Sequence, residues 1–264
     1  MSEVPPLRDA DPAPPEEIGP EEIMIAAIAR LLDGVDHIAV GVLSPIPGSA
    51  ALLARRRTGS RVSIIGSSHP DFRTDGGVDL FDSAGRGRIG AFFLSGGQID
   101  GSANINLTGL GSYPEMDVRW SGAFGSAYLY FLVPRVILFR AEHSRRVFVP
   151  KVDFISAPGT SPPNVYRPGG PYALVTNLCV MRFDRDRGRF CLDGLHPGVS
   201  LEQVRDNTGF DFDIPDTVNQ SPPPDAETLA LIRGPVARDI AGPYPEFAAK
   251  VLGYTQTGLS EAAV

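Results

Sequence analysis

Cysteine is scarce in this sequence, which has only Cys179 and Cys191 among its 264 residues. Two cysteines in a chain of this length form no disulfide framework, and their spacing matches no zinc site. Both lie in apolar, strand-like surroundings, so we expect buried, reduced thiols. No other group of residues has the spacing of metal ligands, and no metal site is predicted.

Long apolar runs and an excess of basic residues are also missing. No stretch approaches the roughly 20 apolar residues of a membrane-spanning helix, and the N-terminus has no apolar run of the signal-peptide type. The 24 Lys and Arg are outnumbered by 31 Asp and Glu. The basic run Arg55 to Arg57 suits the last turn of a helix ended by Gly59, rather than an anion site. We expect a cytoplasmic protein that binds neither nucleic acid nor membrane.

The predicted organisation is a flexible N-terminal arm, residues 1–19, followed by one α/β domain, residues 20–264. The arm is rich in Pro, Asp and Glu and has few large apolar residues. Helices are predicted over residues 21–32, 50–57, about 200–209 and 226–233. Strands are predicted over residues 38–42, 62–66, 89–94, 147–149, and a hairpin of 173–182 with 189–193. The apolar segments 129–133 and 136–139 are left without a type.

This alternation of helices with short, β-branched strands predicts an open, mainly parallel sheet with helices on both faces. Ligands bind such sheets beyond the carboxyl ends of the strands. That rule selects the loops after Val42, Gly66 and Leu94 as candidate parts of a binding site.

The loop after Leu94 is the most informative. Ser95-Gly96-Gly97 lets the backbone approach a ligand, and amides there would stabilise the oxyanion that forms when a carbonyl group is attacked. Four polar side chains follow, Gln98, Asp100, Asn104 and Asn106. The alternative is a tight junction whose polar residues satisfy local backbone groups, and the residues alone favour neither interpretation.

Five motifs, taken in order, resemble the β subunits of class I CoA-transferases, glutaconate CoA-transferase among them. They are Phe93 to Asn106, Arg145 to Ile155 with Pro158-Gly159, Val175 to Leu178, Leu195 to Phe210, and the tail from Pro222 to Arg233. Each motif alone is modest, but five in the family's order are specific. The resemblance covers roughly residues 20–235.

The resemblance implies an α/β protein of the NagB/RpiA-like fold that acts on acyl-CoA thioesters. Coenzyme A is then part of the substrate, and no other cofactor is expected. A separate α subunit is implied, in an αβ or two-α, two-β assembly, with the site between the subunits. The oxyanion or CoA-binding loop is expected at Ser95, Gly96, Gly97 and Gln98. The pocket is expected to be lined by Ser68, His69, Asn104, Gly122 and Gly125.

Two departures from the family pattern bear on the reaction. The family's transferases carry a catalytic Glu after the second buried strand, which attacks the thioester and forms a covalent intermediate. Here that position falls at about Gly66 or Ser67, and no Glu occurs from residue 23 to 114. The family's Gly-Ser-Gly-Gly-Ala-Asn stretch is reduced to Gly122 and Gly125, without the Asn. No catalytic residue is assigned to this chain.

Three functions remain open. The first is a β subunit of an enzyme that moves CoA between carboxylic acids. The second is a hydrolase of the same fold that opens a ring in a CoA thioester, as in steroid breakdown, with the key carboxylate on the α subunit. The third is a non-catalytic β subunit. The missing Glu favours the second or third. A serine nucleophile paired with His69 is less favoured, because neighbouring turn residues point in different directions.

Overall fold

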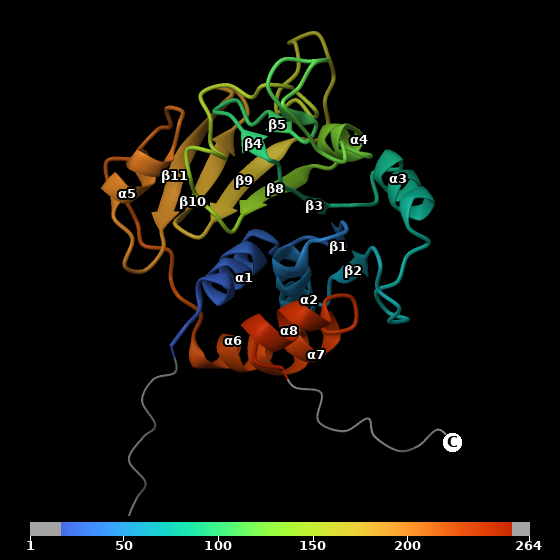
Figure 1. The fold of residues 1–264 in the computed structure, drawn as a ribbon. Coiled ribbons are helices and arrows are strands. Elements are labelled where there is room, and N and C mark those ends of the chain that lie inside the picture. The colour runs from blue at the N-terminus through green and yellow to red at the C-terminus, as the bar shows by residue number, and fades with distance from the viewer. Residues whose placement is uncertain (1–16, 255–264) are drawn as a thin grey trace, which may run out of the picture.

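The computed structural model describes residues 17–254, and a seven-stranded sheet lies at its centre (Figure 1). Across the sheet the order is β11, β10, β9, β8, β3, β1 and β2. Strands β2, β1, β3, β8 and β9 are parallel, whereas β9, β10 and β11 pair antiparallel. The bounds are β1 His37–Val40, β2 Arg61–Ile64, β3 Ala91–Leu94, β8 Arg135–Arg140, β9 Pro171–Thr176, β10 Cys179–Asp184 and β11 Arg189–Leu195.

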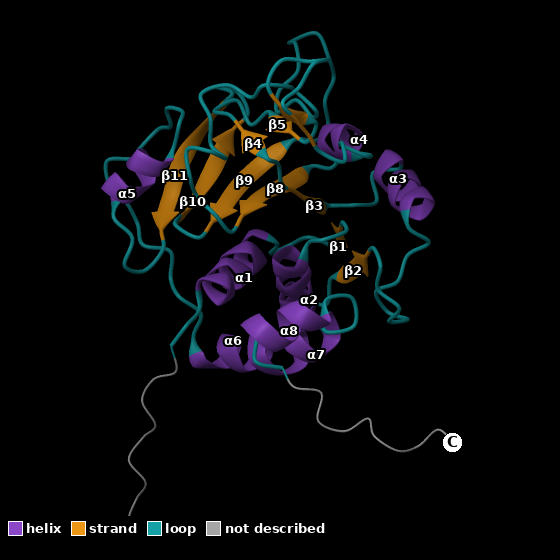
Figure 2. Cartoon of the chain, viewed as in Figure 1, coloured by secondary structure: helices purple, strands orange, loops and turns teal. Residues whose placement is uncertain are grey.

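Helices cover both faces of this sheet (Figure 2). One face carries α1 (Pro20–Leu31), α2 (Pro45–Thr58), α6 (Ala226–Leu231), the π-helical turn η1 (Ile232–Val236), α7 (Ala237–Ile240) and α8 (Pro245–Val251). The other face carries α3 (Gly77–Gly85), α4 (Ser126–Leu132), α5 (Leu201–Asn207) and the two-stranded sheets of β4 (Gln98–Ile99) with β5 (Ile105–Asn106) and β6 (Gly109–Leu110) with β7 (Val118–Arg119). The predicted α/β class and mainly parallel sheet are confirmed.

Alternation along the strands divides the apolar residues between two cores. On β3, Phe93 packs into the core beneath α1 and α2, whereas Phe92 and Leu94 pack into the core beneath α4. Successive side chains of a strand point to opposite faces, so a strand that is covered on both faces is apolar throughout. This explains why β1 and β3 were recognisable as short, continuous apolar runs.

Several predicted boundaries were wrong. Helix α2 begins at Pro45 rather than residue 50, because proline is tolerated in a first helical turn, where its missing N–H costs nothing. The predicted strand 173–182 is two antiparallel strands, β9 and β10. Segment 129–133 lies mostly in α4 and segment 136–139 lies in β8, while 147–149 forms only an isolated bridge, Ile99 with Phe148. Helices α3, α7 and α8 were not predicted.

Other local predictions hold. Gly59 ends α2 with a left-handed φ of 78°, and the arginine run lies in the last turn. The cysteines are both free thiols, but Cys191 is half-buried rather than buried. Most of the predicted arm, residues 1–16, lies outside the described residues.

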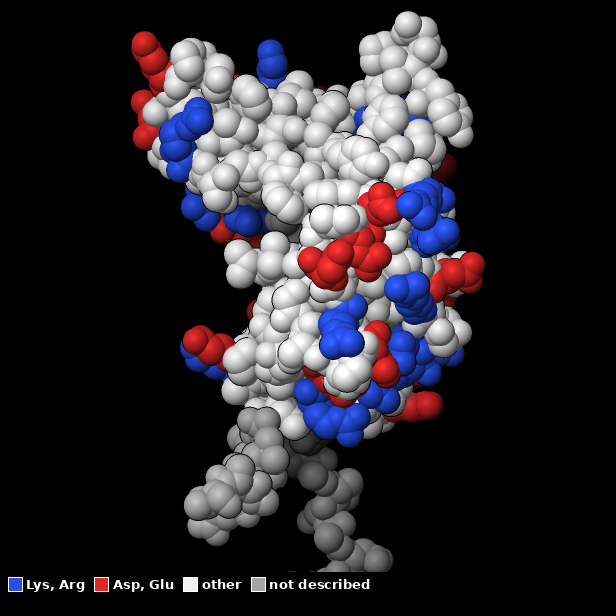
Figure 3. Space-filling model, turned by 90° about the vertical axis from the view of Figure 1, so that its right-hand side faces the viewer, with Lys and Arg blue, Asp and Glu red and all other residues white. Residues whose placement is uncertain are grey.

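Acidic and basic side chains are interleaved over the lower part of the face seen in Figure 3. Arg55 pairs with Asp71 at 3.1 Å and Arg56 pairs with Asp239, so two members of the arginine run have carboxylate partners within the fold. None of the helices within residues 17–254 has the length and apolar character needed to cross a membrane.

The outer edge of β11 is hydrogen-bonded to the segment that follows α5. The amide of Leu192 donates to the carbonyl of Asp213, and the amide of Leu195 donates to that of Asn219. The amide of Ser221 in turn donates to the carbonyl of Leu195 at 2.7 Å. Segment 213–221 therefore covers this edge of the sheet.

Two of the sequence motifs, Val175 to Leu178 and Leu195 to Phe210, meet around His143 in a buried polar cluster beside α5. The ring of His143 lies between two threonines, with Nδ1 2.8 Å from Oγ1 of Thr176 and Nε2 2.9 Å from Oγ1 of Thr208. Its amide donates to Oδ1 of Asn177, and Nε2 of His196 lies 2.8 Å from the Thr176 carbonyl. His143 and these motif residues hold strands and loops together.

We expect His143 to lower the free energy of unfolding by about 2 kcal/mol between pH 7 and pH 5. Burial lowers the pKa of His143 to about 4 from its ordinary 6.5, so the unfolded chain binds the proton first. The stabilisation is complete above pH 6.5 and is lost as the pH falls toward 4. Urea titrations at both pH values should show this loss in the wild type and not in His143→Gln. An equal loss in both proteins would contradict the assignment.

Candidate functional site

A pocket of about 890 Å³ opens at the carboxyl ends of the parallel strands. Residues 41–44 after β1, Ile65 after β2, Ser95 to Gly97 after β3 and Arg140 at the end of β8 all line it. The opposite wall is formed by the segment 120–126, which leads into α4. Two of the three loops selected from the sequence, those after Val42 and Leu94, therefore line one pocket, because parallel strands end at the same edge of the sheet. The turn after β2 contributes Ile65 but no residue after Gly66.

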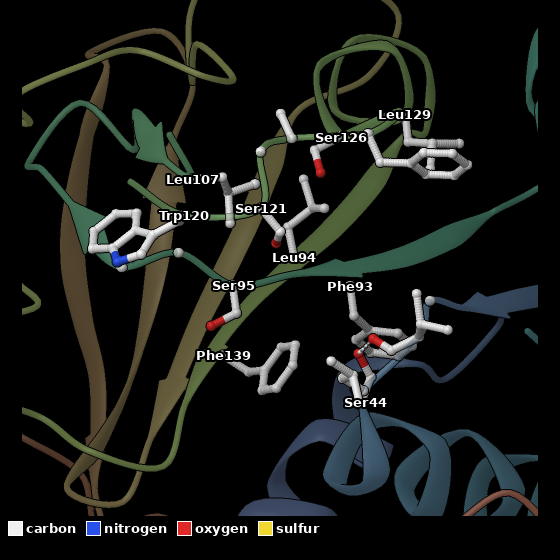
Figure 4. Close-up of a pocket in the computed structure, with 18 of the residues that line it drawn as sticks. Ser44, Phe93, Leu94, Ser95, Leu107, Trp120, Ser121, Ser126, Leu129 and Phe139 are labelled. Carbon is white, nitrogen blue, oxygen red and sulfur yellow. Dashed lines mark hydrogen bonds between the residues drawn. The ribbon is translucent and has the colours of Figure 1, made fainter. Parts of the chain in front are cut away.

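Most of the lining is apolar. In Figure 4 the side chain of Ser95 points into the space beside Phe139, while Leu94 and Leu107 lie near the facing segment. The hydroxyls of Ser44, Ser95, Ser121 and Ser126 supply scattered polar groups. Apolar walls with a few polar groups suit a small organic ligand.

The two glycines after β3 are required by packing, in addition to letting a ligand approach the backbone. A β-carbon on Gly97 would overlap the indole ring of Trp120, and one on Gly96 would lie 2.9 Å from the carbonyl oxygen of Gln98. The amide of Gly97 donates to the carbonyl of Asn106 at 2.9 Å. Within residues 17–254 the amide of Gly96 makes no hydrogen bond, so it is the amide of this pair that is left for a ligand.

The polar residues after Gly97 bond mainly to one another. Oε1 of Gln98 accepts hydrogen bonds from Nδ2 of Asn106 and from the amide of Asp153. Asp100 accepts from the amide and the side chain of Asn104, whose own Oδ1 accepts from the amide of Gly159. Gln98 and Asn104 lie outside the pocket lining, and Asn104 borders a separate hollow. For this part of the loop, the interpretation as a tight junction fits the structure.

The turn after β2 holds the positions at which the family Glu is missing. Gly66 has a left-handed φ of 87°, and Oγ of buried Ser67 accepts a hydrogen bond from the amide of His69. The ring of His69 stacks on Phe72 at 4.5 Å, and its Nδ1 accepts from the amide of Asp71. Ser68 and His69 are exposed and lie outside the pocket lining, contrary to the prediction. No Ser–His pairing of side chains exists in this turn.

Gly122 and Gly125, two of the residues expected to line the pocket, belong to its lining. Gly125 packs against the ring of Phe81, which a β-carbon would overlap, and Gly122 has a left-handed φ of 97°. Between them Phe124 is 85% exposed and also left-handed, with φ 46°, as is Leu43 across the pocket, with φ 55° and 87% exposure. Left-handed backbone is unfavourable for non-glycine residues, so both large apolar side chains are held outward at a cost in energy.

The charged groups of the lining are two arginines, Arg140 and Arg146, and no Asp or Glu of residues 17–254 belongs to it. Arg146 pairs with Glu142 at 2.6 Å. Arg140 was missed in the sequence because the segment 136–139 had no assigned type. A charged residue directly after an apolar strand was the available signal.

Comparison with known proteins identifies relatives along most of the chain. The family model of coenzyme A transferase matches residues 18–207. The B subunit of the 3-oxoadipate CoA-transferase of Pseudomonas knackmussii is 31% identical over 249 residues, which cover 84% of this chain and 94% of that protein. The cholesterol ring-cleaving hydrolase IpdB subunit of Rhodococcus jostii is 27% identical, with 82% and 92% covered.

A similar structure is that of the decarboxylase AibA/AibB, with a TM-score of 0.69 and 27% identity over 82% of this chain and 94% of that one. The relatives thus include a transferase, a hydrolase and a decarboxylase on one fold. By the extent of these matches, by its fold and by its ordered motifs, the chain belongs to the coenzyme A transferase family and is of the β-subunit type.

Proposed function

We propose that this chain is the β subunit of a heteromeric enzyme that acts on acyl-CoA thioesters, and that it supplies the acyl pocket but not the nucleophile. The observation that carries the proposal is the lining of the pocket, which holds two arginines and, within residues 17–254, no carboxylate. Covalent CoA transfer needs a carboxylate nucleophile, since only a carboxylate forms the acid anhydride that precedes transfer. The substrate brings coenzyme A, and no separate cofactor is needed.

The partner in this proposal is an α subunit, as the paired names of AibA and AibB indicate for that decarboxylase. It would close the pocket over the exposed apolar rim that includes Leu43 and Phe124. It would also bring the carboxylate that acts as base. The amide of Gly96 is then placed to stabilise an oxyanion of the thioester carbonyl. We place the complex in the cytoplasm, where reduced cysteines are the rule.

Of the reactions represented among the relatives, hydrolysis is favoured over transfer. The turn at Gly66 and Ser67 offers no acid, and its serine hydroxyl is held by the amide of His69. A hydrolase needs only a water molecule and a base on the partner, so it tolerates the loss of the nucleophile from this chain. CoA transfer is the second candidate, supported by the relative from Pseudomonas knackmussii.

The test uses the complex purified with its α subunit. It is incubated with 3-oxoadipyl-CoA, glutaconyl-CoA and ring-bearing CoA thioesters, with labelled acetate as acceptor, and then treated with borohydride. We expect no labelled residue on this chain, no acetyl-CoA, and a product that has gained one water molecule. A reduced residue on this chain, together with labelled acetyl-CoA, would establish covalent transfer instead.

A further inference from the structure

Arg140 is the last residue of β8, and it lies at one end of the pocket. The pocket extends across the ends of four strands, from Ile65 after β2, past β1 and β3, to Arg140. Three strand spacings separate β2 from β8, which amounts to roughly 14 Å. A ligand whose reacting group lies near β2 or β1 therefore has its far end close to Arg140.

The guanidinium of Arg140 has no ion pair or side-chain hydrogen bond with residues 17–254, and its Nε is buried without a partner. The nearest acid in sequence, Glu142, is already bound to Oγ of Ser144 at 2.7 Å and to Arg146 at 2.6 Å. Burial lowers the pKa of Arg140, which remains a cation. Arg140 is therefore a half-buried cation to which no carboxylate of residues 17–254 is bonded, and a ligand that brings an opposite charge would complete its pairing.

The surroundings of Arg140 indicate what that ligand group is. Arg140 lines a mostly apolar chamber that has Phe139 and Val147 among its walls, and it is itself half-buried. A planar guanidinium binds carboxylates in a bidentate manner, and the pairing is strong where water is excluded. CoA also carries oxyanions in its phosphates, but these are highly hydrated and are less suited to an apolar chamber.

We propose that Arg140 binds a carboxylate at the far end of the acyl group, and so selects thioesters of dicarboxylic acids. The proposal rests on the proposed function, because it takes the acyl group to lie in this pocket. It adds a specificity residue that neither the sequence motifs nor the missing nucleophile indicates. Arg140 contacts the substrate in this arrangement and takes no part in bond making or breaking.

Binding measurements test the proposal without turnover. Two thioether analogues are titrated into the purified complex by calorimetry, one of glutaryl-CoA and one of pentanoyl-CoA. The acyl chain of the first ends in a carboxylate, and that of the second ends in a methyl group. The wild type should bind the glutaryl analogue more tightly. Arg140→Gln should weaken that analogue by about 10- to 100-fold and leave the pentanoyl analogue unchanged, as expected for loss of a charge-assisted hydrogen-bonded pair.

Unchanged pentanoyl binding shows that the variant is folded. Arg145→Gln is the matched control, because Arg145 is exposed, lies outside the lining and donates to the carbonyl of Asp206; its preference should equal that of the wild type. Equal weakening of both analogues in Arg140→Gln would assign Arg140 to the CoA phosphates and overturn the proposal, as would no change in either. If neither analogue binds the wild type, the proposed function fails as well.

Discussion

Gly159→Ala is expected to destabilise the chain by about 3 kcal/mol or more, since an added β-carbon has no space. It would overlap the carbonyl oxygen of Ser102 and lie 2.7 Å from the carbonyl carbon of Ala103. These are backbone atoms, which cannot rotate away as a side chain can. Ala103 is itself left-handed, with φ 59°, and its carbonyl accepts a hydrogen bond from the buried hydroxyl of Tyr130. The clash therefore reaches α4 and the wall of the pocket.

Urea unfolding of Gly159→Ala against the wild type measures this effect. Gly234→Ala is the matched control, because a β-carbon there meets no atom within 4 Å and the residue lies in the π-helical turn. It should be neutral or stabilising by up to about 1 kcal/mol. Similar midpoints for the two variants would show that the loop of residues 102–104 yields to the added carbon, and the expectation would be wrong.

Glu22→Ala is expected to cost about 3 kcal/mol, because it removes one partner of a largely buried ion pair. The carboxylate accepts from Nε of Arg233 at 2.6 Å and from Nη2 at 2.9 Å, and its side chain is 5% exposed. It also accepts from the amide of Gly19, the N-cap residue of α1. One substitution therefore loosens both the start of α1 and its contact with η1.

Glu21→Ala serves as the control, since Glu21 occupies the same helical turn and forms no ion pair with residues 17–254. It should change the free energy of unfolding by less than about 1 kcal/mol, the usual worth of a charge near a helix N-terminus. Thermal melts of Glu22→Ala and Glu21→Ala at low and high salt measure the two losses of stability. If Glu22→Ala had the same melting temperature as Glu21→Ala, the ion pair of Glu22 with Arg233 would contribute little to stability.

The central strands could be predicted because their signal lies in the local sequence. Runs such as 38–42 and 89–94 are apolar on both faces, so burial selects them before any tertiary contact is known. The boundary of α2 could not be predicted, since Pro45 and Pro47 suit a loop equally well. The turn within 173–182 was hidden because two apolar strands adjoin with only residues 177 and 178 between them.

The site was predicted in position but only partly in composition. Ser95 to Gly97 line the pocket, yet the need for glycine at Gly97 comes from Trp120, and no local pattern connects residues 23 positions apart. Gln98 and Asn106 resembled ligand-binding groups because they are polar and follow a strand. They bond to each other and to nearby backbone groups, which is visible only once β4 pairs with β5.

The covered edge of β11 bears on how the chain avoids aggregation before it binds a partner. Open sheet edges recruit other strands and begin aggregates, and a subunit made apart from its partner is exposed to that hazard. Here the segment 213–221 already occupies the backbone groups of Leu192 and Leu195. Another chain cannot extend the sheet along this stretch, so association there must proceed through side chains, which distinguish a correct partner from a second copy.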